Sequence, residues 1–241
     1  MLLALLTALG VGGATIIGAL CGFCLKRVSQ TFQSVTMSAA AGVMFAAAVV
    51  GLFLPALEGG TWDYAAVLLG AACGGLCLNF CDWLLQKHSP GGGERQKLLL
   101  FVAAIAVHNL PEGLAAGVGF GTGSTELALT VALGIALQNL PEGMVVVAPL
   151  LAAGFSPGKT LLIACGTGVS EIVGTLLGYC AVSAAAAVLP FSLAFAGGCM
   201  VYVIVDEMIP MAHREGRHGE SYAFLLGFCG MLLLSDLLSR N

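Results

Sequence analysis

The sequence predicts an all-α integral membrane protein, a bundle of eight transmembrane helices that contains an inverted repeat. Apolar residues make up 59% of the 241 residues, charged residues make up only 9%, and the mean hydropathy is +0.99. A soluble domain usually carries about 25% charged residues, so this chain has too little charge to cover a surface in water. Composition therefore argues against a very apolar soluble bundle. The sequence has no basic tail and no basic aromatic stripe that would indicate a nucleic-acid partner.

Eight apolar segments are each long enough to cross a hydrocarbon core of about 30 Å as a helix. Short connectors rich in glycine, proline and charge separate them, so the chain, 1–241, is expected to form a single transmembrane domain. The first segment lacks the basic residues that precede a signal-peptide core, and it is interpreted as a span. The expected spans are residues 2–24, 33–57, 64–86, 98–119, 125–150, 160–183, 188–210 and 221–238.

The basic residues predict the orientation in the membrane. When the connectors are assigned to alternate sides, Arg240 falls on one side and all the other Lys and Arg residues fall on the opposite side. Since cytoplasmic loops carry the excess of Lys and Arg, both termini are expected outside the cytoplasm and the number of spans is expected to be even. The residues on the expected cytoplasmic side are Lys26, Arg27, Lys87, Arg95, Lys97, Lys159, Arg214 and Arg217.

A five-residue motif occurs twice, in two consecutive spans. The segment Asn109–Gly113, with the sequence Asn-Leu-Pro-Glu-Gly, recurs as Asn139–Gly143, thirty residues later. Consecutive spans run in opposite directions, so the two copies are expected to be inverted relative to each other. Inverted repeats with a site near the midplane are a common plan of secondary transporters.

Three carboxylates lie inside apolar spans: Glu112, Glu142 and Glu171. Each would cost about 2.5 kcal/mol or more at a helix centre, which implies partners, protonation, a wet cavity or a cation. At about 1.5 Å per residue, all three lie roughly 18–22 Å from the cytoplasmic ends of their helices. They therefore share one layer near the middle of the membrane, which independent accidents of packing would not produce.

Polar side chains accompany the glutamates of both motifs. His108 and Gln138 each lie four residues before a motif glutamate, so each shares a helical face with it. Asn109 and Asn139 add amide oxygens. Imidazole suits zinc, iron, copper and nickel, whereas carboxylate and amide oxygens suit harder ions, so the set predicts a site for several first-row dications. The alternatives are a hydrogen-bonded network that only packs the helices, and a proton relay.

An enzyme is not expected. An intramembrane metalloprotease would need His-Glu-x-x-His on one helix, whereas His108 is followed by Asn109 and that motif is absent from the sequence. No catalytic residue is therefore predicted. The alternative within the transport class is a metal-selective or proton-conducting channel that uses the same carboxylates. No role is assigned to Asp82.

These motifs resemble the ZIP (Zrt/Irt-like) family of divalent metal-ion transporters, and most closely its GufA-like branch. The resemblance covers nearly the whole chain: the motif pair, Glu171 within Gly168–Gly174, and the segment Asp206–Pro210 that closes the seventh span. It implies uptake of Zn²⁺, with Fe²⁺, Mn²⁺ or Cd²⁺ as further substrates, towards the cytoplasm. The metal is the bound substrate, and no prosthetic group is implied.

The resemblance also implies a binuclear centre in the fourth and fifth spans. One ion would be held by His108, Glu112, Gln138 and Glu142. The other would be held by Asn109, Asn139 and Glu171, bridged by Glu112 and Glu142. Many relatives have His at the position of Gln138 and some have Asp at that of Asn139, and both departures lower the basicity or charge of the centre.

Three further expectations concern the setting of this site. The family implies an elevator-like movement of spans one, four, five and six against the others, often in a homodimer. Glu207, His213 and His218, which follow the seventh span, are candidates for the exit path of the metal. The protein is expected to be a multi-pass protein of the cell membrane, and its compactness favours a bacterial inner membrane.

Overall fold

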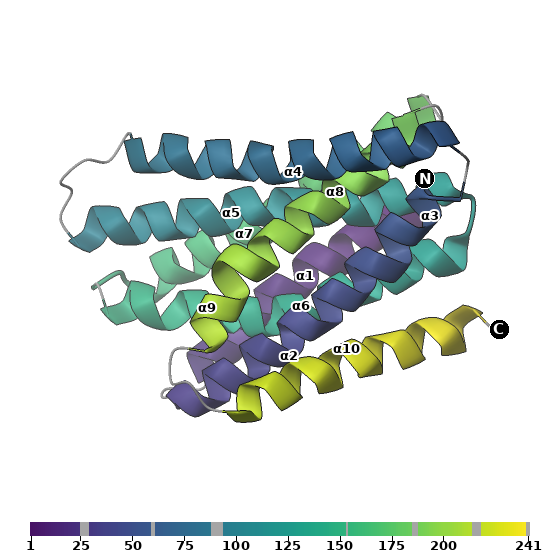
Figure 1. Cartoon of the computed structure of the whole chain (residues 1–241). Coiled ribbons are helices and arrows are strands. Elements are labelled where there is room, and N and C mark those ends of the chain that lie inside the picture. The colour runs from purple at the N-terminus through teal and green to yellow at the C-terminus, as the bar shows by residue number, and fades with distance from the viewer. Residues whose placement is uncertain are drawn as a thin grey trace.

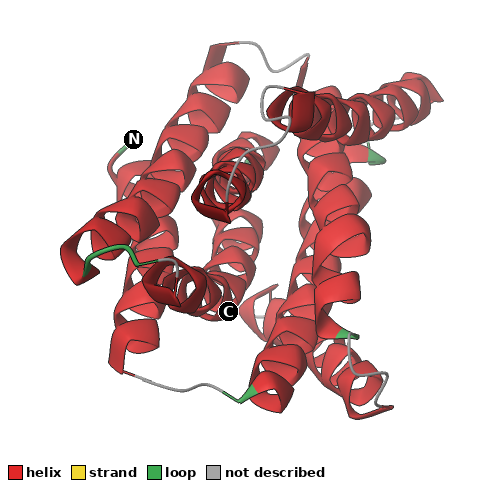
Figure 2. Ribbon diagram, turned by 90° about the vertical axis from the view of Figure 1, so that its left-hand side faces the viewer, coloured by secondary structure: helices red, strands yellow, loops and turns green. Residues whose placement is uncertain are grey.

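A computed structural model describes residues 1–24, 29–58, 61–87, 94–152, 154–184, 188–213 and 218–239. Within these ranges the chain is helical and contains no strand (Figure 2). The helices are α1 (Leu2–Cys24), α2 (Gln30–Ala48), η1 (Val49–Phe53), α3 (Leu54–Ala56), α4 (Thr61–Lys87), α5 (Glu94–Val118), η2 (Gly119–Thr122), α6 (Thr125–Ala152), α7 (Pro157–Ala184), α8 (Leu189–Val203), η4 (Ile204–Met208), α9 (Ile209–Ala212) and α10 (His218–Ser239).

Each expected span coincides with one long helix or with a run of joined helices. Several helices begin about a turn before the apolar segment, because polar residues cap them. Ser29, for example, accepts a hydrogen bond from the amide of Phe32 at 3.2 Å, and α2 begins at Gln30 instead of at residue 33. Such caps satisfy the free amides of a first helical turn. The helical bounds therefore exceed those that hydropathy predicts.

The all-helical membrane class is confirmed, while the number of spans stays a prediction. Six helices of the described part are long and apolar enough to cross a bilayer, and α5 and α6, which carry the two motifs, are not among them. Outward-facing leucines such as Leu68, Leu162 and Leu226 are 73–74% exposed, as expected of side chains that face lipid. Of the basic residues that predict the orientation, Lys26, Arg27, Arg214, Arg217 and Arg240 lie outside the described residues.

The long helices pack mainly in pairs. The pair α5 and α7 and the pair α1 and α6 are joined through contacts between α1 and α7. The pair α4 and α8 and the pair α2 and α10 lie on the opposite side of the bundle, where α4 and α10 form its outer edges (Figure 1). The four helices α1, α5, α6 and α7 therefore form one group, and α2, α4, α8 and α10 flank it.

Glycines bring α5 and α7 into direct backbone contact. A Cβ atom at Gly113 would overlap the carbonyl oxygen of Glu171, and one at Gly174 would overlap the carbonyl oxygen of Leu110. Small residues allow membrane helices to approach this closely and to gain van der Waals contact along their backbones. The last residue of the first motif is therefore a packing residue that sets the separation of α5 and α7.

The pair α6 and α1 repeats these contacts at corresponding positions. Gly143 meets the carbonyl oxygen of Thr15, and Gly18 meets that of Leu140. The contacts lie 30 residues later in α6 than in α5, and 156 residues earlier in α1 than in α7. By this correspondence, Thr15 occupies in α1 the position that Glu171 occupies in α7.

The flanking pairs show the same kind of correspondence. In α2 and α10, Gly42 meets the carbonyl oxygen of Phe224. In α8 and α4, Gly198 meets that of Ala71. Here α8 corresponds to α2 with the same offset of 156 residues, so the repetition extends beyond the five-residue motif.

Two helices contain a π-helical turn just before a proline. The turn η1 ends two residues before Pro55, and η4 ends two residues before Pro210. In each turn an amide bonds to the carbonyl five residues earlier, Leu54 to Val49 and Ile209 to Ile204. Proline removes an amide donor and its ring crowds the carbonyl four residues earlier, so a wider turn at this place relieves the crowding.

Candidate metal centre

The residues that the motifs single out meet in the interior of the four-helix group. Helix α5 supplies His108, Asn109 and Glu112, α6 supplies the equivalent residues of the second motif, and α7 supplies Glu171. Glu142 is half-buried, and the other six side chains are at most 2% exposed. Burial of polar groups on this scale requires partners, because each unpaired group would lose its hydration without compensation.

Glu171 accepts hydrogen bonds from three different helices. Its Oε1 atom accepts from the Thr15 hydroxyl at 2.6 Å and from the Asn109 amide at 2.5 Å. Its Oε2 atom accepts from the Asn139 amide at 2.5 Å. Three donors stabilise the charged form of a carboxylate, so they offset part of the cost of burying Glu171. Thr15, which no sequence motif indicated, is the contribution of α1.

The side-chain amide of Asn139 has only one orientation that suits its neighbours. Its nitrogen lies between two acceptors, Oε2 of Glu171 and the carbonyl oxygen of Val11, the latter at 3.2 Å. An oxygen at that place would face two other oxygens without a proton to share. The Oδ1 atom therefore points the other way, where it accepts from Nε2 of Gln138 at 2.7 Å.

Gln138 joins the two motifs. Besides Asn139, its Nε2 atom donates to Oε2 of Glu112 at 2.6 Å, so one amide group links α6 to the glutamate of α5. The glutamine thus occupies the donor position beside Glu112, and its own oxygen remains available as an acceptor.

Two acceptor atoms of this layer have no hydrogen-bond partner within the described structure. Buried polar atoms almost always have one, so such a group of lone pairs is the feature that a bound cation would satisfy. The atoms are Oδ1 of Asn109 and Oε1 of Gln138.

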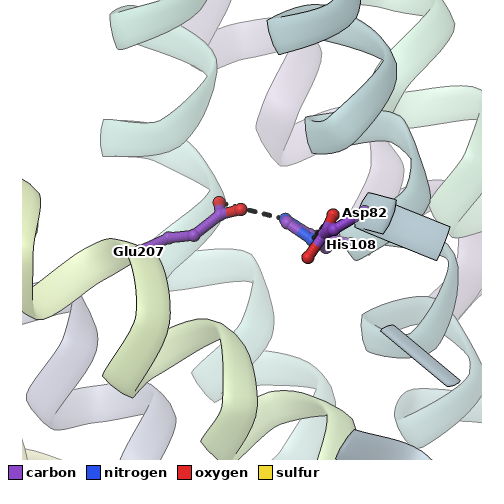
Figure 3. Close-up of side chains that lie close together, drawn as sticks. All are labelled: Asp82, His108 and Glu207. Atoms are coloured by element: carbon purple, nitrogen blue, oxygen red, sulfur yellow. Dashed lines mark ion pairs between the residues drawn. The ribbon is translucent and has the colours of Figure 1, made fainter. Parts of the chain in front are cut away.

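The imidazole of His108 faces two carboxylates outside the motifs (Figure 3). Its Nδ1 atom lies 3.0 Å from Oε2 of Glu207 in η4, and its Nε2 atom lies 3.5 Å from Oδ1 of Asp82 in α4. The longer contact is an electrostatic one, because a hydrogen bond would be shorter. The Glu207 side chain is 31% exposed and that of Asp82 is 16% exposed, so this cluster is less buried than the layer around Glu171.

Asp82, His108 and Glu207 could themselves hold a divalent ion. Among the described residues they are the group of three metal-binding side chains whose ligand atoms all lie within 4.8 Å of one another. Carboxylate oxygens and an imidazole nitrogen are suitable ligands for first-row dications. The sequence indicated Glu207 as an exit-path candidate but gave no role to Asp82, because nothing in the spacing of α4 shows that Asp82 faces α5.

Six of the seven predicted metal ligands lie in one or the other of two clusters. Glu112 meets Gln138, and both asparagines meet Glu171, whereas His108 turns towards Asp82 and Glu207. The binuclear ligand set stays a prediction.

The two histidines after the seventh span lie elsewhere. His213 ends α9, with Nδ1 3.2 Å from the carbonyl oxygen of Ile209 and Nε2 3.4 Å from the hydroxyl of Ser221. His218 is the first residue of α10 and is exposed. Their role in the exit path also stays a prediction.

Comparison with known proteins assigns the chain to a family. The sequence profile of the ZIP zinc transporters matches residues 85–235, which include both motifs and Glu171. The chain is 40% identical over 245 residues to zinc transporter GufA of Myxococcus xanthus, covering 95% of this chain and 96% of the relative. It is 35% identical over 245 residues to zinc transporter ZIPB of Bordetella bronchiseptica, covering 93% and 78%. A shorter match, 43% over 152 residues, joins 60% of this chain to 44% of human zinc transporter ZIP11. The chain therefore belongs to the ZIP zinc transporter family.

Proposed function

We propose that this chain carries Zn²⁺, and related first-row dications, across the cell membrane into the cytoplasm. The observation that carries the proposal is the buried layer in which two amide oxygens without hydrogen-bond partners, those of Asn109 and Gln138, lie beside Glu112 and Glu171. A cation supplies what these lone pairs lack, and the glutamates supply the charge that offsets its dehydration. The names of the relatives support zinc as the cargo.

We propose further that the ion moves from this layer to the cluster of Asp82, His108 and Glu207. His108 connects the two places, because its backbone lies one residue from Asn109 while its ring contacts both carboxylates of the cluster. The greater exposure of Glu207 supports a position nearer to water. In this scheme the ion moves from a buried site to a more exposed one, and carboxylates bind it at both places.

The movement proposed for the cycle is a displacement of α1, α5, α6 and α7 against α2, α4, α8 and α10. The packing supports this division, because the main helix pairs all lie within one group or the other. The repeated glycine contacts support an inverted repeat, since α5 and α6 are joined by the short segment 119–124 and carry equivalent contacts. Bacterial relatives support an inner-membrane location.

The experiment that tests the function is uptake into proteoliposomes that contain a zinc-sensitive dye. We expect the initial rate of Zn²⁺ entry to saturate with Zn²⁺ concentration and to fall when Cd²⁺ is added, because both ions need the same ligands. Liposomes without protein provide the background. A rate equal to this background would refute transport of zinc, and a rate that rises without saturation would replace the carrier by a channel.

Replacement of His108 by alanine should change selectivity more than folding. The imidazole is the only nitrogen ligand among the predicted metal ligands, so its loss should disfavour Zn²⁺ and Cd²⁺ relative to Mn²⁺, with zinc uptake at least roughly tenfold slower. The measurement is the ratio of Zn²⁺ to Mn²⁺ uptake in the same vesicle preparation. An unchanged ratio would show that the ring does not contact the cargo.

A further inference from the structure

We propose that Thr15, Asn109 and Asn139 hold Glu171 as a fixed anion in place of a second metal ion. Each chain then binds one cargo ion in the layer that contains Glu112, Glu142 and Glu171. The inference rests on the proposed transport function, because it concerns the number of ions in the same layer. It differs from the binuclear arrangement that the family resemblance implies.

Hydrogen bonds occupy most of the Glu171 carboxylate. An ionised carboxylate has about four lone-pair positions. Thr15 and Asn109 use both positions of Oε1, at 2.6 and 2.5 Å, and Asn139 uses one position of Oε2, at 2.5 Å. One position, on Oε2, is left for a metal ion, and bidentate binding would have to displace donors from Oε1.

Position 139 carries an amide and not a carboxylate. The side-chain nitrogen of Asn139 donates to Glu171 and also to the carbonyl oxygen of Val11, at 3.2 Å. Aspartate cannot donate in this way, and its carboxylate would repel Glu171 unless a cation or a proton lay between them. Asparagine thus contributes a hydrogen bond where aspartate would recruit a positive charge.

The repeated contacts of the two helix pairs relate Thr15 to Glu171. Thr15 in α1 corresponds to Glu171 in α7, because each supplies the carbonyl oxygen that a motif glycine abuts. The two corresponding side chains are a donor and an acceptor, and they bond to each other directly. The half of the site that contains α1 therefore contributes a hydroxyl where the other half contributes a carboxylate.

Charge balance agrees with these contacts. With one dication, Glu112 and Glu142 neutralise the ion, and the remaining negative charge of Glu171 is stabilised by its three donors. With two dications, the three carboxylates leave an excess positive charge that faces the amide hydrogens of Asn109 and Asn139. Such an excess is unfavourable inside a protein, where charges are weakly screened.

The test is a count of Zn²⁺ ions bound to the full-length chain in detergent, by native mass spectrometry and isothermal titration. All proteins carry Asp82→Asn and Glu207→Gln, so that the cluster around His108 does not contribute to the count. We expect one ion per chain in this parent protein. We also expect one ion after Glu171→Gln, and two ions after Asn139→Asp, which adds a fourth carboxylate to the layer.

Each outcome has a distinct meaning. A parent that binds two ions, and loses one of them on Glu171→Gln, overturns the inference but leaves the transport function standing. A parent that binds none overturns both. If Asn139→Asp binds one ion and elutes as a folded protein, the amide is not what excludes the second ion, and the inference fails. If that variant does not fold, the count in the parent decides.

Discussion

Replacement of Glu112 by glutamine is expected to abolish zinc uptake while the protein still folds. The glutamine has the same length and can still accept the hydrogen bond that Nε2 of Gln138 donates to Glu112 at 2.6 Å. What it loses is the negative charge at a side chain that is 2% exposed. Breaking a buried ion pair typically costs about 3–5 kcal/mol, which corresponds to a fall in uptake of about 100-fold or more.

The measurement is the initial rate of dye-reported Zn²⁺ entry, corrected for the amount of protein in the vesicles. Glu112→Ala should be equally inactive and less stable, because it also removes one of the two acceptors of the Gln138 amide. Glu126→Gln is the control, because Glu126 is exposed in the first turn of α6 and should tolerate the change. Uptake by Glu112→Gln near that of the control would remove Glu112 from the metal site.

The largest structural effect is expected from Gly117→Val. A Cβ atom at this position would overlap the carbonyl oxygen of Thr175, so the valine cannot be accommodated by a change of rotamer. Helices α5 and α7 would have to separate. Asn109, about two helical turns from Gly117 along α5, would then lose its contact with Glu171. Overpacking costs about 1–3 kcal/mol where side chains can adjust, and a clash with backbone should reach or exceed the upper value.

Gly166→Val is the matched control on α7. Nothing lies within 4 Å of a Cβ atom at Gly166, so the same substitution should leave the protein intact. The measurement is the fraction of monodisperse protein that remains after heating in detergent, followed by size-exclusion chromatography. Equal losses in the two variants would show that the contact between α5 and α7 does not limit stability.

Hydropathy was sufficient to predict the class of fold and the positions of the helices. Apolar segments identify spans because helices are the way for a single segment to satisfy its backbone in lipid. The helix starts were missed by a few residues, since caps such as Ser29 are polar and lie outside the apolar segments. The π-helical turns at 49–53 and 204–208 were missed because they depend on where a proline meets its neighbouring turn.

The polar residues of the site could be predicted only where the sequence repeats itself. The motifs and the depth of Glu171 identified residues that the structure does bring together in hydrogen-bonded contact. Thr15 and Asp82 were not identified, because a single threonine or aspartate in a span carries no local signal. Their roles follow from helix pairing, which hydropathy does not encode. Glycine spacing was a usable signal, since Gly18 and Gly174 lie three residues after Thr15 and Glu171.

The π-helical turn η4 alters the rotational phase of its helix. Each residue of an α-helix advances by about 100°, so a turn that takes in one extra residue sets back everything beyond it by about that angle. Glu207 lies inside this turn, and its direction towards His108 depends on the extra residue. Deletion of a single residue between 204 and 208 would leave the hydropathy of the segment almost unchanged. It would nevertheless rotate the residues beyond the deletion relative to the rest of the bundle, and Glu207 would no longer point towards His108. Insertions and deletions here should therefore disturb the site more than most substitutions do.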